Sequence, residues 1–165
     1  SKEKFDKNGK LASIGKRNEI ILEQARELYS YRINKEKLSF DTSDFDISFV
    51  RGLSLQDGAA TLTEFTGSII GEELSSSLLK FNNKVKNILI CGGGRKNKIL
   101  LKKIKKNLSL DINLKLIDDY KVDGDFVESQ AFAFLAIRSL LKLPISFPNT
   151  TGCLKPCSGG ELIKN

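Results

Sequence analysis

Residues 87–97 read Asn-Ile-Leu-Ile-Cys-Gly-Gly-Gly-Arg-Lys-Asn, and they join three signals that α/β proteins place together. The apolar run Ile88–Cys91 is typical of a buried strand. Three consecutive glycines then allow a sharp turn and the close approach of another group to the backbone. A helix pattern follows from Asn97 to Leu108. This order builds many nucleotide sites at the carboxyl edge of a sheet, although it also occurs as a tight connection without a ligand.

The glycine spacing argues against two familiar phosphate-binding motifs. Consecutive glycines do not match the G-x-G-x-x-G of a dinucleotide site. They also do not match a P-loop, because no Ser or Thr follows Lys96. A nucleotide bound here would be held by glycine backbone against its sugar and base, or against a phosphate.

The length and composition indicate a globular protein. A chain of 165 residues suits one domain or one lobe of a larger protein. It is 40% hydrophobic and 28% charged, and no run is apolar enough to span a bilayer. The polar N-terminus lacks a signal-peptide core, so we expect a cytoplasmic protein without a membrane partner. Three cysteines fit reduced thiols better than a disulfide scaffold: Cys91, Cys153 and Cys157.

Histidine and methionine are both missing from the sequence. Without histidine the chain has no His general base, His metal ligand or Ser–His triad. We expect no metal-ligating residues, because Cys153 and Cys157 have no second ligand pair. The chain also contains no Met and begins with Ser, which suggests a piece of a longer protein.

The net charge of +7 is concentrated on the predicted helix after the glycines. Its apolar residues group on one side, and lysines cover the rest, which is first of all a solvated helix face. No aromatic residues lie between the lysines to stack on bases, so we expect no nucleic-acid partner. The lysines concerned are Lys96, Lys98, Lys102, Lys103, Lys105 and Lys106.

Further helices are predicted before the glycine segment. Apolar spacing predicts a helix over residues 18–31 and another over residues 54–79. Ser54 can cap the second helix, with Asp57 as the acid of a capping box. Gly67 and Gly71 are expected to weaken or bend it. Residues 5–15 and 34–46 have the polar, turn-rich character of loops.

The remaining elements suggest an α/β fold with too few strands. Residues 113–117 predict a second strand, and residues 126–142 predict a helix so apolar that it should be largely buried. We expect the two strands to be adjacent and parallel, with helices packed on this small sheet. Because two parallel strands are not stable alone, we expect either that some loops hide further strands or that further strands come from sequence absent here, which would leave this sheet incomplete. The expected parts are a loop and helix region 1–53, an α/β core 54–145 and a surface tail 146–165.

Several segments, in this order and spacing, resemble the C-terminal half of the anhydro-N-acetylmuramic acid kinases. The resemblance covers nearly the whole chain, and its ordered set is more specific than any single motif. The matching segments are Phe5-Asp6-x-x-Gly9-x-x-Ala12-x-x-Gly15, Gln56-Asp57-Gly58-Ala59-Ala60-Thr61-Leu62, Cys91-Gly92-Gly93-Gly94 with Asn97, Glu128-Ser129-Gln130-Ala131-Phe132-Ala133-Phe134-Leu135-Ala136 and Pro148-Asn149-Thr150-Thr151-Gly152.

This resemblance implies a fold and a reaction. Such kinases belong to the superfamily of sugar kinases, actin and heat-shock chaperones, whose two RNase-H-like lobes hold ATP in the cleft between them. The chain would be the nucleotide-side lobe, with ATP and magnesium as cofactors. The reaction would convert 1,6-anhydro-N-acetylmuramic acid to N-acetylmuramic acid 6-phosphate during peptidoglycan recycling. Its partners would be this anhydro amino sugar, ATP, and the missing N-terminal half or a homo-oligomer partner.

The sequence departs from the family where catalysis is concerned. The family's phosphate loops and its Asp general base belong to segments expected before residue 1. Its Pro-Pro-Lys-Ser-type loop is altered to Lys37-Leu38-Ser39-Phe40-Asp41, its usual Arg is Thr42, and its Glu-Ala pair is Glu128-Ser129. We therefore expect no catalytic residue in this chain, and no activity of the chain alone.

The resemblance also suggests roles for the glycines and for Asn97. Gly92, Gly93 and Gly94 would lie against the adenosine end of ATP, where a Cβ would push the nucleotide away. Asn97 could bond the nucleotide or simply cap the following helix.

Two acids are candidate cleft residues. Asp57 could help to organise the cleft or a metal-bound water, or it could be only a favourable helix-start acid. Glu128 could face the sugar, or it could be a first-turn acid of its helix. The alternative function is non-catalytic: a truncated or split module that needs a partner, or a basic binding protein.

Overall fold

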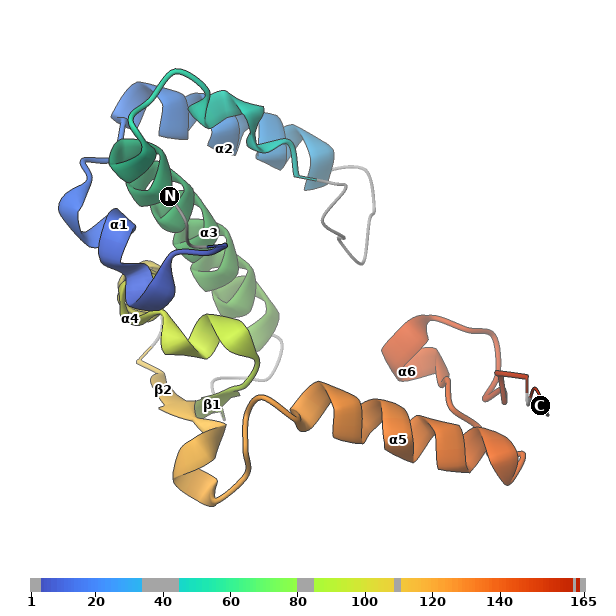
Figure 1. Ribbon diagram of the computed structural model, residues 1–165. Helices are drawn as coiled ribbons and strands as arrows, with labels where there is room; N and C mark the ends of the chain where they lie inside the picture. The colour runs from blue at the N-terminus through green and yellow to red at the C-terminus, as the bar shows by residue number, and fades with distance from the viewer. Residues whose placement is uncertain (1–3, 34–44, 80–84, 109–110, 162, 164–165) are drawn as a thin grey trace. The chain divides into compact units, whose positions relative to one another are not determined.

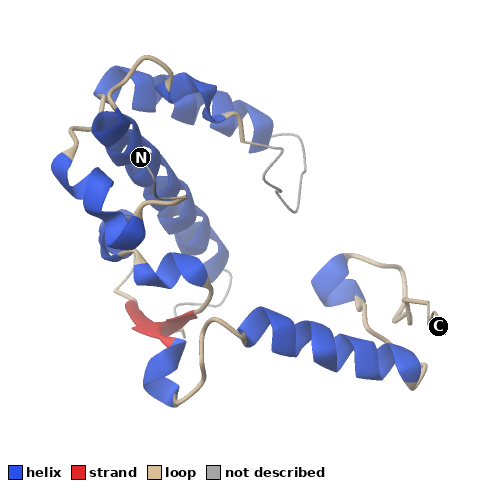
Figure 2. Cartoon of the chain, in the orientation of Figure 1, coloured by secondary structure: helices blue, strands red, loops and turns tan. Residues whose placement is uncertain are grey.

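A computed structural model describes residues 4–33, 45–79, 85–108, 111–161 and 163. Most of these residues are helical, and one two-stranded sheet is present (Figures 1 and 2). The chain divides into two compact units, Ser1–Leu116 and Ile117–Asn165, which we describe separately. The altered loop at residues 37–42 lies outside the described residues.

The sheet confirms the predicted strand pair. Strand β1 (Asn87–Ile90) and strand β2 (Asn113–Leu116) are adjacent and parallel, with Asn87 opposite Asn113 and Ile90 opposite Leu116. The 3-10 turn η4 (Gly93–Lys96) and helix α4 (Lys98–Asn107) connect them, as the sequence pattern predicts.

Helix α3 (Leu55–Leu79) is the longest element described in the first unit, and its N-terminus is capped as predicted. The Asp57 backbone N–H donates to Ser54 Oγ at 3.1 Å. The Asp57 carboxylate does not complete a capping box. It accepts the backbone N–H of Lys16 at 2.7 Å and so ties the preceding segment to the start of α3.

The glycines within α3 are packing positions. A Cβ built on Gly67 would overlap Lys103 and lie 3.0 Å from its carbonyl carbon. A Cβ on Gly71 would lie 2.8 Å from Asn107 Cβ. Both glycines are buried, so their missing side chains let α4 approach the α3 backbone closely. The expectation that they weaken or bend the helix did not foresee this contact.

The segment predicted as loop at residues 5–15 contains a 3-10 turn η1 (Lys7–Gly9) and a short helix α1 (Lys10–Ile14). The prediction missed α1 because its five residues are too few to show helical spacing. The two carboxylate oxygens of Asp6 accept the backbone N–H groups of Leu11 at 2.8 Å and Ala12 at 3.0 Å. These are donors that a helix N-terminus leaves unpaired.

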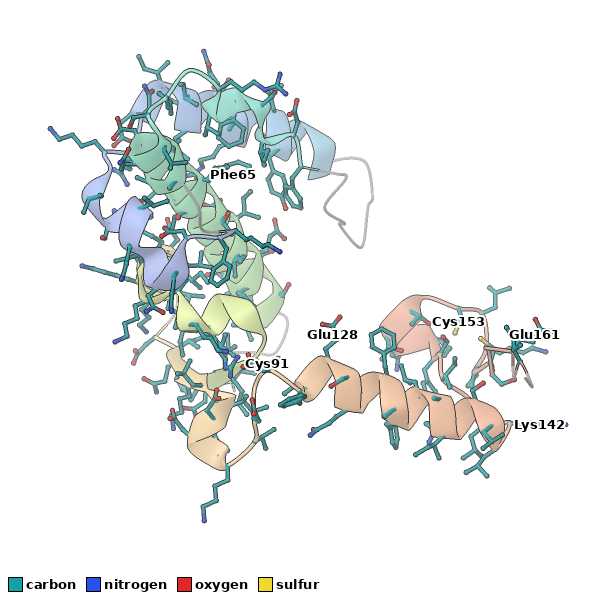
Figure 3. The ribbon with its side chains drawn as sticks, viewed as in Figure 1. Phe65, Cys91, Glu128, Lys142, Cys153 and Glu161 are labelled. Carbon is teal, nitrogen blue, oxygen red and sulfur yellow. The ribbon has the colours of Figure 1, made fainter. Side chains whose placement is uncertain are left out.

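Helix α2 (Glu19–Ile33) packs on α3 through an apolar cluster, as its predicted amphipathic spacing requires. Phe65, labelled in Figure 3, lies at the centre of this cluster with Leu22 and Ala25. Its ring meets Phe49 of the 3-10 turn η3 (Ile47–Val50) edge-on, with 5.1 Å between centroids. The cluster fixes α2 and η3 to the N-terminal half of α3.

The second unit holds the 3-10 turn η5 (Ile117–Tyr120), helix α5 (Val127–Leu140) and the short helix α6 (Pro148–Thr151). The tail folds back through a bridge between Ser146 and Cys157. Inside this unit, Arg138 Nε donates to the Pro144 carbonyl at 2.7 Å, and its guanidinium lies over the Phe134 ring.

The prediction that α5 is largely buried is wrong. All 14 residues of α5 are described, and none of them is buried. Phe132 is 65% exposed and Leu140 is 62% exposed. An apolar pattern shows that a helix can be buried, but burial also needs a packing surface.

Among the described residues, no helix is long and apolar enough to cross a membrane.

Candidate functional site

The glycine turn directly follows β1 and has open space above its backbone. Gly92 adopts φ +75°, which favours glycine. A Cβ on Gly92 or on Gly93 would meet no atom within 4 Å, and a Cβ on Gly94 would meet only Leu100 at 3.7 Å. All three glycines are exposed. Internal packing therefore does not require glycine at Gly93, and the turn leaves room for a group outside the described residues.

Asn97 caps α4, which is one of its two predicted roles. Its Oδ1 accepts the backbone N–H groups of Ile99 at 3.1 Å and Leu100 at 3.0 Å. Its own backbone N–H donates to the Gly94 carbonyl at 3.0 Å. Asn97 therefore closes the glycine turn and starts the helix. Whether it also touches a nucleotide stays a prediction.

Arg95 is a residue of the turn that the sequence analysis missed. Only 6% of it is exposed, and its Nη1 donates to the Gly92 carbonyl at 3.0 Å. The side chain therefore folds back beneath the turn that its own backbone forms. A single arginine beside a glycine run gives no sequence signal that separates this role from that of a surface cation.

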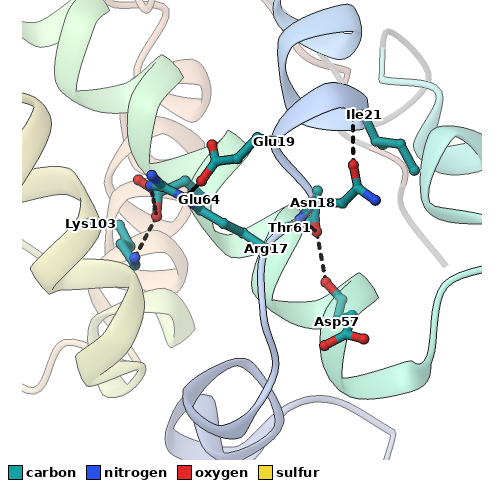
Figure 4. Close-up of polar contacts among 8 residues, drawn as sticks. All are labelled: Arg17, Asn18, Glu19, Ile21, Asp57, Thr61, Glu64 and Lys103. Atoms are coloured by element: carbon teal, nitrogen blue, oxygen red, sulfur yellow. Dashed lines mark hydrogen bonds and ion pairs between the residues drawn. The ribbon is translucent and has the colours of Figure 1, made fainter.

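Asp57 links two segments of the first unit. Its carboxylate accepts the backbone N–H of Lys16. Its backbone carbonyl accepts a hydrogen bond of 2.7 Å from the hydroxyl of Thr61, a fully buried residue (Figure 4). The hydrogen bond from Lys16 is the main cause that lowers the pKa of Asp57, so the carboxylate is ionised at neutral pH. This geometry accounts for Asp57 as a structural acid, and its role in a cleft remains a prediction.

Glu128 lies in the first turn of α5, with its side chain exposed (Figure 3). It belongs to the second unit, whereas the glycine turn and Asp57 belong to the first. The structure therefore joins Gly92, Gly93, Gly94 and Asn97 into one turn of the first unit, and a role of Glu128 in a cleft stays a prediction. Within the described residues, no group of three or more His, Cys, Asp or Glu side chains is placed to hold a metal ion.

A buried acid that the sequence analysis missed lies between α3 and α4. Glu64 is 4% exposed, and its Oε2 lies 3.0 Å from Arg17 Nη1 and in contact with Lys103 Nζ (Figure 4). Both cations are at ion-pair distance, although neither makes a hydrogen bond of regular geometry to this oxygen. Burial alone would raise the pKa of Glu64, but Lys103 and Arg17 outweigh burial and lower the pKa.

A sequence signal for Glu64 does exist. It shares one face of α3 with small buried residues at helical spacing, including Ala60, Gly67, Gly71 and Ser75. A stripe of small residues marks a face where another helix comes close. An acid on that face needs a cation from the partner helix, because a buried charge is costly unless it is paired.

Two of the α4 lysines serve the fold. Lys103 pairs with Glu64, and Lys105 Nζ donates to the Ile112 carbonyl. The solvated lysine face is therefore smaller than the sequence suggests.

Comparison with known proteins identifies the relatives of this chain. The family model described as anhydro-N-acetylmuramic acid kinase matches residues 1–165. A protein of Pelagibacter ubique named anhydro-N-acetylmuramic acid kinase is 55% identical over 162 residues, which are 98% of this chain and 43% of the relative. Proteins with the same name are 36% identical in Zymomonas mobilis, over 96% of this chain, and 38% identical in Rhizobium rhizogenes, over 97% of it.

In the last two relatives the match covers 41% of the relative. The chain thus spans less than half the length of these relatives. The matched regions nevertheless include both units and the glycine turn. The chain belongs to the anhydro-N-acetylmuramic acid kinase family.

Proposed function

We propose that this chain is the nucleotide-side part of an ATP-dependent kinase. The proposed reaction converts 1,6-anhydro-N-acetylmuramic acid to N-acetylmuramic acid 6-phosphate, with water opening the anhydro ring, in peptidoglycan recycling. In this proposal the first unit belongs to an actin-like ATPase lobe, and ATP and the anhydro sugar are its ligands.

The observation that carries the proposal is the open glycine turn at the carboxyl end of β1. Gly93 needs neither a positive φ nor space inside the protein, so internal packing does not explain glycine there. Bare backbone at a strand end beside a helix N-terminus suits the close approach of a nucleotide.

This chain would supply some of the groups that the reaction needs, and the rest of the kinase would supply the others. Phosphoryl transfer needs positioning, charge stabilisation and a base that takes a proton from the attacking water. The glycine turn would position the adenosine end of ATP. Arg95 and Asn97 would hold the turn in shape. No described carboxylate is marked as the base, and the resemblance puts the base outside this chain. Magnesium would accompany ATP.

The first prediction concerns Gly93→Val. We define the exchange chimera as the Pelagibacter ubique kinase in which this chain replaces the matching 43%. In this chimera, Gly93→Val should raise the Kd for ATP at least about tenfold, because the added bulk fills the space above the turn. The affinity for the sugar and the melting temperature should change little, since φ at Gly93 is not positive and a Cβ there meets no atom within 4 Å.

Calorimetric titration with ATP and with the sugar measures this effect, and Gly93→Ala provides a graded control. Thiol labelling is a second readout: ATP should slow the reaction of the exposed Cys91 with a maleimide but not that of the exposed Cys157. Unchanged ATP affinity in a folded Gly93→Val protein would mean that the glycine run is only a tight connection between strand and helix, without a ligand.

A further inference from the structure

The turn η1 is held by hydrogen bonds within its own segment. Asp6 fixes the start of α1 through its two bonds to Leu11 and Ala12, and the Gly9 backbone N–H donates to the Asp6 carbonyl at 3.2 Å. Gly9 itself has φ +73° and is buried. Thus the position of Gly9 is set by the Asp6 segment.

Gly9 lies directly against the residue that closes the glycine turn. A Cβ built on Gly9 would lie 2.8 Å from Ile99 Cγ1 and closer still to Asn97 Oδ1. That oxygen is the atom that caps α4. The bare Gly9 backbone therefore occupies a place where any other residue would collide with the cap.

We propose that the η1 turn is a positioning element of the nucleotide site: Gly9 holds Asn97 in its capping position, and Asn97 thereby fixes the end of the Gly92–Gly94 turn. The proposal rests on the proposed function, which it deepens by naming a positioning residue. The Asn97 backbone N–H bonds the Gly94 carbonyl, so a shift of Asn97 moves the turn itself. Gly9 acts through Asn97 and needs no contact with the nucleotide.

The structure offers a matched control for Gly9. Gly52 also has a positive φ, +89°, but a Cβ on it would meet no atom within 4 Å. Gly9→Ala and Gly52→Ala therefore introduce the same kind of backbone strain. Only Gly9→Ala adds the collision with Asn97 Oδ1 and Ile99.

The first experiment follows amide hydrogen exchange in the 165-residue chain. In Gly9→Ala, exchange of the amides from Arg95 to Leu101 should become about tenfold faster, because the cap and the turn open more often. Gly52→Ala should leave those amides within about twofold of their original rates. Equal exchange at these amides in the two variants would overturn the proposal, whether or not the chain binds ATP.

The second experiment measures ligand affinity in the exchange chimera. Gly9→Ala should raise the Kd for ATP about tenfold and leave the KM for the sugar within about twofold. The double variant Gly9→Ala with Asn97→Ser should recover part of the lost ATP affinity, because the shorter serine still caps a helix and removes the closest collision, whereas the overlap with Ile99 Cγ1 at 2.8 Å remains. Failure of this recovery would overturn the proposal.

The two proposals fail in different ways. If Gly93→Val leaves ATP affinity unchanged, the nucleotide assignment itself is wrong. If Gly93→Val weakens ATP binding but Gly9→Ala weakens it no more than Gly52→Ala, the nucleotide assignment stands and only the positioning role of Gly9 is wrong.

Discussion

At the scale of single residues, the cap of α4 shows how much depends on one oxygen atom. Asn97 Oδ1 accepts two backbone N–H groups that the helix leaves unpaired. A direct bond from the same oxygen to a nucleotide would compete with this capping. The geometry therefore favours capping as the role of the oxygen.

The second prediction concerns the substitutions Asn97→Ser and Asn97→Ala. Serine caps helices nearly as well as asparagine, so Asn97→Ser should keep the ATP affinity of the exchange chimera within about twofold. Asn97→Ala should lower the free energy of unfolding by about 1 kcal/mol, because the cap is lost. Titration and chemical denaturation measure the two effects. A large loss of ATP affinity in a stable Asn97→Ser protein would show that the amide bonds the nucleotide.

At the scale of helices and strands, the crossing of α3 and α4 depends on the glycines in α3. The third prediction is that Gly67→Ala lowers the free energy of unfolding by about 1–3 kcal/mol, since its Cβ would overlap Lys103 and force the helices apart. Gly58→Ala in the same helix is the control. Its Cβ would meet Val50 at 3.8 Å, an ordinary contact, and helix propensity should stabilise it by up to about 1 kcal/mol.

Chemical denaturation of both variants tests this contrast. The two variants should change the free energy of unfolding in opposite directions. Because both replace a glycine of α3 by alanine, this contrast separates the effect of packing from that of helix propensity. If Gly67→Ala raised the free energy of unfolding, the α3–α4 interface would be able to accommodate the added methyl group, contrary to this prediction.

The buried acid on the same helix face makes the α3–α4 contact sensitive to pH. Because the pKa of Glu64 is lowered in the folded chain, its ion pairs stabilise the fold above the ordinary value of 4.5. That stabilisation is lost as pH falls through the lowered pKa. The fourth prediction is that Glu64→Gln costs about 2 kcal/mol at pH 7 and that the variant loses less further stability between pH 5 and pH 3 than the original chain.

Glu72→Gln is the matched control for Glu64→Gln. Glu72 lies on the same helix and pairs with Arg26, but the side chains of Arg26 and Glu72 are 44% and 49% exposed, so its change should cost at most about 1 kcal/mol. Denaturation midpoints across the pH range give the comparison. Equal costs for the two substitutions at pH 7 would contradict the importance of the buried pair.

The elements were predictable where their signals are local. Periodicity and caps predicted α2, α3, α4 and both strands, because these depend on neighbouring residues, and the strand–helix–strand order predicted the parallel pairing. Helix α1 was missed because its five residues are too few to show helical spacing, although the Asp6 carboxylate that holds its start lies nearby. The roles of Gly9, Gly67 and Glu64 were missed because their partners lie far away in sequence. The exposure of α5 was missed because an apolar helix reveals nothing about what covers it.

At the scale of the whole molecule, the proposed nucleotide site stands without a recognised general base among the residues that the structure describes. The fifth prediction is that the 165-residue chain alone does not phosphorylate 1,6-anhydro-N-acetylmuramic acid, whereas the exchange chimera does. A coupled assay of ADP release, with and without the sugar, measures both proteins. Sugar-dependent turnover by the chain alone would show that it contains a complete catalytic set. An inactive but folded chimera would favour the non-catalytic alternative.

The contact between Gly9 and Asn97 also bears on the order in which the first unit folds. Strand β1, helix α4 and strand β2 follow one another in sequence, so the two strands pair by closing a relatively short stretch of chain, at modest entropic cost. Gly9 reaches Asn97 only when the beginning of the chain closes a far longer loop, and such contacts form more slowly. The glycine turn would therefore exist first in a loose form, and the N-terminal segment would tighten it late in folding.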